Sequence, residues 1–142
     1  ESGSFPNPEA ALAVVDFSGP APAVREYAVG GFGLWLEVGL DGRAYVTAVP
    51  DPSVFETKVV YVFDPATEQF VRGPGDPLPL ARPDGTPASC WAATAADDGR
   101  VFCAEDRGAA NGLLYVYGAD LKGQTSIGIG LLPTDLWVAA LR

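Results

Sequence analysis

The sequence predicts an all-β protein built from a repeated four-stranded antiparallel meander. Its 17 glycines and 13 prolines are spread along 142 residues and separate short apolar runs, which is typical of strands joined by turns. No window of about 11 residues has the 3.6-residue apolar period of an amphipathic helix. When the sequence is compared with itself, the same order of strand-like segments occurs twice.

The first half of the repeat is a tryptophan-containing strand, an Asp-Gly-Arg turn and an aromatic strand. This order occurs in residues 33–46 and again in residues 89–103. Asp-Gly pairs adopt the left-handed backbone conformation that a tight hairpin needs. The sequence therefore predicts two equivalent hairpins.

The second half of the repeat is another hairpin, in residues 59–72 and in residues 113–129. The strands that end in Phe63 and Tyr117 are apolar on both faces. We therefore expect neighbouring layers of the protein to cover both faces of these strands.

Incomplete units flank the two complete ones. Residues 12–17 and 23–29 resemble the third and fourth strands of an earlier unit, and residues 135–140 resemble the tryptophan strand of a later one. Within one all-β unit spanning residues 1–142, the predicted boundaries are 1–30, 31–74, 75–130 and 131–142. Because the repeat is interrupted at both ends, we expect other copies, other chains or a longer parent chain to complete it.

The repeat resembles a blade of the β-propeller fold. Trp35, Trp91 and Trp137 occupy matching places, so the period is 56 and then 46 residues, close to the roughly 40–50 of known blades. Residues 60–70 resemble the outer hairpin of a kelch-type blade, and residues 78–82 resemble its inter-blade linker. The kelch glycine doublet is absent. The resemblance implies a partial β-propeller, and the alternative is a single β-sandwich or barrel.

Composition restricts the function. The net charge of −9 disfavours nucleic acid and anionic membrane surfaces as partners. The absence of histidine excludes Ser-His or Cys-His catalysis and imidazole metal sites. No phosphate-binding loop or metal-ligand cluster is found, so we expect no cofactor and no metal. The compartment stays open.

The two cysteines, Cys90 and Cys103, favour free buried thiols by a simple register argument. If Asp98 and Gly99 form a two-residue turn, Cys103 faces Thr94 and lies about 13 Å from Cys90, too far for a disulfide. A longer turn or a bulge would change this register, so a disulfide remains the alternative.

A meander places alternate loops on opposite edges of its sheet, and the longer loops share one edge. Long loops on a rigid scaffold commonly carry binding residues. The candidate binding residues of this loop face are Asp51, Glu56, Arg82, Asp84, Glu105, Asp106, Arg107 and Asn111.

We expect a non-catalytic binding or assembly module whose partner is a protein, a glycan or further copies of the chain. A lectin-like module that uses the tryptophans is one alternative, although we expect these side chains to pack between blades. A propeller fragment of a carboxylate-based hydrolase is another.

Overall fold

The computed structural model describes residues 10–54, 57–105 and 112–130, which form ten strands and one short 3₁₀ helix. The elements are β1 (Ala11–Asp16), β2 (Ala23–Ala28), β3 (Phe32–Val38), β4 (Ala44–Val49), η1 (Pro52–Val54), β5 (Val59–Asp64), β6 (Gln69–Arg72), β7 (Ala92–Ala95), β8 (Val101–Glu105), β9 (Leu113–Tyr117) and β10 (Thr125–Gly128).

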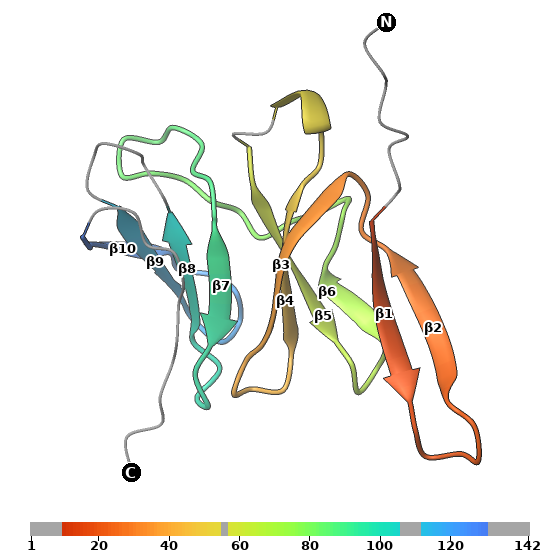
Figure 1. Cartoon of the computed structure of the whole chain (residues 1–142). Coiled ribbons are helices and arrows are strands. Elements are labelled where there is room, and N and C mark those ends of the chain that lie inside the picture. The colour runs from red at the N-terminus through yellow and green to blue at the C-terminus, as the bar shows by residue number, and fades with distance from the viewer. Residues whose placement is uncertain (1–9, 55–56, 106–111, 131–142) are drawn as a thin grey trace, which may run out of the picture.

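The strands form three antiparallel sheets that stand side by side in Figure 1. The hairpin β1–β2 is the first, and the others are the meanders β3-β4-β5-β6 and β7-β8-β9-β10. None of the described sheets closes into a barrel. The predicted all-β class and the repeated four-stranded antiparallel meander are confirmed.

The two Asp-Gly-Arg turns have the same hydrogen-bond pattern. Gly42 donates its N–H to the Gly39 carbonyl, and Gly99 donates to the Ala96 carbonyl, both at 3.0 Å. Gly42 and Gly99 have φ angles of 81° and 80°, in the left-handed region that glycine tolerates best. The repeated sequence therefore forms a repeated turn.

The hairpin β1–β2 covers one face of the middle sheet. Leu12 of β1 packs in a buried cluster with Val46 of β4 and with Tyr61 and Phe63 of β5. The rings of Tyr27, on β2, and Phe63 are in contact, with centroids 4.8 Å apart.

The sheet β7–β10 covers the opposite face of the middle sheet. Tyr45, Val60 and Val62 pack there against Ala93 and Tyr115 in a second buried cluster. Successive residues of a strand point to opposite faces, and the two clusters take alternate residues of β4 and β5. The expectation that both faces of β5 are covered is confirmed.

The outer strand face of the third sheet is less completely covered. Tyr115 and Tyr117 of β9 are buried, whereas Leu114 and Val116, which point the other way, are half-buried. Trp35 is 39% exposed, whereas we expected the tryptophan side chains to be packed between blades. Trp137 and the predicted strand 135–140 lie outside the described residues.

Cys90 and Cys103 form a disulfide, with Cα atoms 5.8 Å apart, so the prediction of free thiols is wrong. The turn after β7 is longer than two residues, and Cys103 pairs with Ala93 instead of Thr94. In addition, β7 begins only at Ala92. Cys90 precedes it and donates its N–H to the Lys58 carbonyl at 3.2 Å, so its path departs from the strand extrapolation.

Among the described residues there is no helix with the length and apolar character that crossing a bilayer would require.

Candidate functional site

Four of the eight predicted site residues lie within the described parts of the chain. They are Asp51, Arg82, Asp84 and Glu105; the other four, Glu56, Asp106, Arg107 and Asn111, lie outside them. The structure brings Arg82 and Glu105 together, although 23 residues separate them in the sequence. We call the carboxylate of Glu105 and the groups that bind it the Glu105 clamp.

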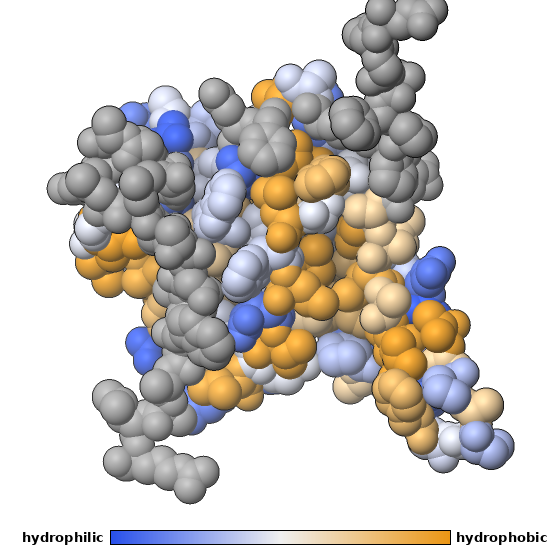
Figure 2. All heavy atoms as spheres, in the orientation of Figure 1, coloured by the Kyte–Doolittle hydropathy of each residue, from blue (hydrophilic) through white to orange (hydrophobic). Residues whose placement is uncertain are grey.

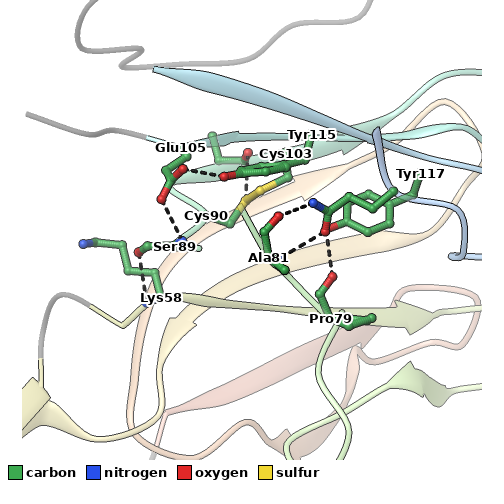
Figure 3. Close-up of a disulfide and its surroundings, with 11 residues drawn as sticks. Lys58, Pro79, Ala81, Ser89, Cys90, Cys103, Glu105, Tyr115 and Tyr117 are labelled. Atoms are coloured by element: carbon green, nitrogen blue, oxygen red, sulfur yellow. Dashed lines mark hydrogen bonds between the residues drawn. A yellow bond between two sulfur atoms is a disulfide. The ribbon is translucent and has the colours of Figure 1, made fainter. Parts of the chain in front are cut away.

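Glu105 is the last residue of β8, and its side chain is completely buried. Its Oε1 atom accepts hydrogen bonds from Arg82 Nε at 3.0 Å, Arg82 Nη2 at 2.6 Å and the Ser89 amide at 3.2 Å. Its Oε2 atom accepts a hydrogen bond from the Tyr115 hydroxyl at 2.5 Å. Figure 3 shows this carboxylate between Ser89 and Tyr115, beside the disulfide. Both carboxylate oxygens are therefore engaged.

A tight turn holds Arg82 in position for the clamp. The Arg82 amide donates to the Thr86 carbonyl at 2.8 Å, and the Gly85 amide donates to the Arg82 carbonyl at 2.8 Å. The sequence Pro83-Asp84-Gly85 suits such a turn, because proline fixes φ and glycine takes the positive φ of 82° observed here. The hydrogen bond to Glu105 raises the pKa of Arg82.

Asp84 and Asp51 have local structural roles in their loops. Asp84 accepts hydrogen bonds from the Thr86 amide at 3.0 Å and hydroxyl at 2.7 Å. Asp51 accepts them from the Ser53 amide at 2.9 Å and hydroxyl at 2.6 Å, at the start of η1. These bonds lower the pKa of both carboxyl groups. Both side chains therefore stabilise turns of the loop face.

Further contacts fasten the long linker between the second and third sheets to the clamp region. The Lys58 amide donates to Ser89 Oγ at 3.1 Å, and Lys58 Nζ lies 5.0 Å from the centre of the Trp91 ring. Further along the linker, the Pro79 carbonyl accepts a hydrogen bond at 2.9 Å from the hydroxyl of Tyr117, on β9 of the third sheet (Figure 3). The linker is thus a fixed part of the scaffold.

A second clamp of the same kind joins the first two sheets. Glu68, in the turn between β5 and β6, accepts hydrogen bonds from Arg25 Nη2 and from the Tyr27 hydroxyl, both at 2.5 Å. The Tyr27 and Arg25 hydrogen bonds lower the pKa of Glu68. Glu68 has a φ of 54°, so these two contacts hold a non-glycine residue in a left-handed conformation.

The chemistry of the Glu105 clamp is that of a structural ion pair. The Glu105 side chain is completely buried and both of its oxygens accept hydrogen bonds, so the carboxylate is not open to solvent as a general base or a nucleophile would be. Within residues 10–54, 57–105 and 112–130, no group of three or more His, Cys, Asp or Glu side chains could hold a metal ion. The clamp orders the turn around Arg82 on the loop face.

Sequence reasoning selected Arg82 and Glu105 but missed Tyr115 and Ser89, and it kept the disulfide only as the alternative. Tyr115 offered a signal, because a tyrosine in the middle of an apolar strand must find a partner for its hydroxyl when it is buried. Ser89 offered none, since its contribution is a backbone N–H that any residue except proline supplies.

No protein-family model matches this sequence, and no curated protein matches it significantly.

Proposed function

We propose that this chain is a non-catalytic binding or assembly module on a propeller-like scaffold, completed by other copies or chains. The observation that carries the proposal is the face-to-face stacking of the three sheets. The middle sheet is covered on both faces, whereas each outer sheet is covered on one face by described residues.

The two outer faces of the stack carry exposed apolar side chains. Val15 and Val24 are cross-strand partners on the outward face of the hairpin, and both are exposed. On the far side, Ile127 of β10 is exposed and pairs with the half-buried Leu114. Exposed apolar sheet faces of this kind favour association with a further layer.

The contact between the two four-stranded sheets supports the propeller-like arrangement. The first strand of the third sheet, β7, contacts both β3 and β4. The Leu40 amide, just after β3, donates to the Ala95 carbonyl at the end of β7 at 2.9 Å. Blades around a common axis meet in this way at their first strands.

The loop face is the proposed ligand-binding surface, and its ligand is a protein or a glycan. The Glu105 clamp holds the turn around Arg82 rigid, so loop residues can be presented without a large ordering cost. Half-exposed Trp35 favours carbohydrate binding as the second candidate, because aromatic faces stack on sugars. A glycan array without any hit would count against this second candidate.

Light scattering over a range of concentrations tests assembly. We expect a mass above 14.8 kDa that rises with concentration. The substitutions Val24→Glu and Ile127→Glu should reduce association, since each places a charge on an outer face. Val71→Glu is the matched control, because Val71 is exposed on β6, outside these faces. A 14.8 kDa monomer at every concentration would contradict completion by further copies of this chain.

A further inference from the structure

The hairpin β1–β2 covers only part of the face on which it packs. Tyr61 and Phe63, on β5, are buried beneath the hairpin. On the same face, Leu36 and Val38 of β3 remain 52% and 62% exposed. They share that face because they pair with Val46 and Ala44 of the same buried cluster. The uncovered area is therefore continuous with the covered one.

An apolar groove of about 250 Å³ lies between the hairpin and β3. Its walls include Leu12 and Val29 on the hairpin side, Leu34 and Leu36 on β3, and Val46 on β4, and no lining residue is charged. Figure 2 shows hydrophobic side chains gathered over β3 beside the hairpin. The groove thus presents an apolar floor to an incoming segment.

One wall of the groove is the free edge of a strand. Among the described residues, β1 pairs only with β2, so its other edge has no described partner strand. In the predicted repeat β1 corresponds to β5 and β9, and each of these two strands pairs on both edges. Residues Ala11 and Leu12 of β1 line the groove, and no residue of β2 does. The unpaired N–H and C=O groups of an edge strand form a template for another strand.

We propose that this groove binds an extended strand of another polypeptide, which pairs antiparallel with the free edge of β1. Alternate side chains of the bound strand are apolar and contact Leu36 and Val46, since successive residues of a strand point to opposite faces. The proposal rests on the proposed assembly function and names one site and one kind of partner for it. The mode of recognition is β-strand addition.

The partner strand belongs to another protein and not to a second copy. The β1–β2 hairpin of a copy already packs its inner face, with Leu12, against its own middle sheet. The net charge of −9 also favours a neutral or basic segment over an acidic one. Residues 1–9 contain Pro6 and Pro8, which lack the N–H that a strand ladder needs.

The structure itself supplies the sequence of a suitable probe. β1 corresponds to the third strand of the predicted repeat, which is β5 in the middle sheet. The strand that pairs with β5 on its inner side is β4, so β4 is a model for a strand that would pair with β1. The probe is a fluorescein-labelled peptide with the sequence of residues 43–49, which begins with the basic Arg43. Its residues corresponding to Ala44, Val46 and Ala48 are apolar and alternate along the strand. Its control is the same peptide with alternate backbone amides N-methylated, which keeps the side chains and removes ladder hydrogen bonds.

Fluorescence anisotropy with the full chain measures binding. We expect the probe to bind saturably, the N-methylated peptide to bind at least about tenfold more weakly, and Leu36→Asp to weaken probe binding by about tenfold. Val71→Asp is the matched control, because Val71 is 44% exposed on another edge strand, β6, and binding should change less than about twofold. If Leu36→Asp does not fold, Leu34→Asp replaces it, because Leu34 also lines the groove.

Several outcomes would overturn the inference. These are equal binding of the two peptides, no effect of the groove substitution, or no binding up to the solubility limit of the probe. If Leu36→Asp converts an oligomer into a monomer, the occupant is a second copy and the inference is wrong. A chain that associates in light scattering but ignores the probe retains the assembly function without this site. A chain that stays monomeric in light scattering but binds the probe has the groove site without the proposed self-association.

Discussion

Removal of the Cys90–Cys103 disulfide should lower the free energy of unfolding by about 3 kcal/mol. The cysteines are 13 residues apart in sequence, and cross-linking a loop of this length removes about that much chain entropy from the unfolded state at 25 °C. The perturbation is the double substitution Cys90→Ala and Cys103→Ala.

Urea unfolding followed by circular dichroism is the assay. With an m value of about 2 kcal/mol/M, the midpoint should fall by about 1.5 M. The wild-type protein in a reducing agent is the control that separates two effects. Oxidised and reduced wild type differ by the cross-link, whereas reduced wild type and the double variant differ by the packing of two buried sulfur atoms.

The reasoning is refuted if oxidised and reduced wild type unfold at the same urea concentration. Two thiols that react with an alkylating agent in the unfolded, non-reduced protein would refute it independently. Either result would restore the expectation of free thiols from the strand register.

Three further predictions concern the clamp, the contact between sheets and alkaline pH. Glu105→Gln should lower the free energy of unfolding by about 2 kcal/mol in urea, because it removes the carboxylate charge from a buried, hydrogen-bonded ion pair whose Arg82 partner is partly exposed. The control is Asp84→Asn, in an exposed turn, which should change the free energy of unfolding by less than about 0.5 kcal/mol. Gly39→Ala should lower the free energy of unfolding by about 1–3 kcal/mol, since the new Cβ would lie 2.8 Å from the Ala95 Cβ and 2.9 Å from the Tyr45 ring. The control Gly128→Ala places its Cβ more than 4 Å from any other atom and should leave stability nearly unchanged. Equal thermal unfolding midpoints for the two variants would contradict the close approach of Gly39 to Ala95. Burial, reinforced by the hydrogen bond to Asp41, raises the pKa of Tyr45 above the value of about 10 in an unfolded chain. The contribution of Tyr45 to stability is therefore complete below about pH 10 and is lost as the pH rises further. Between about pH 8 and 11.5, the unfolding midpoint should fall less steeply for Tyr45→Phe than for the wild-type protein.

The features predicted well from sequence are those set by local chemistry. Asp-Gly-Arg turns and short apolar runs indicated the hairpins, because turn conformation and strand formation are set over a few residues. The both-sided apolar pattern of β5 also predicted its position between two layers. These arguments needed no knowledge of the tertiary structure.

The features that failed depend on how the chain departs from regular strands. The strand register disfavoured the disulfide because Cys90 precedes β7 and hydrogen-bonds to Lys58, a long-range contact that no local pattern specifies. Arg82 and Glu105 were both selected as loop-face residues, yet their pairing follows from the path of the linker. Trp35 was expected to pack between blades because its neighbours are apolar, but it is 39% exposed on β3, an edge strand of the middle sheet.

The double-sided burial of β5 has a consequence for the protein before it is folded. Val59–Phe63 is a short run of β-branched and aromatic residues without proline, the kind of segment that drives aggregation while a chain is unfolded. A lysine, Lys58, stands directly before it and an aspartate, Asp64, ends it. These charges act as gatekeepers during synthesis, when the two layers that later cover β5 have not yet formed. Neutralising both should leave the native contacts of β5 in place and lower the soluble yield.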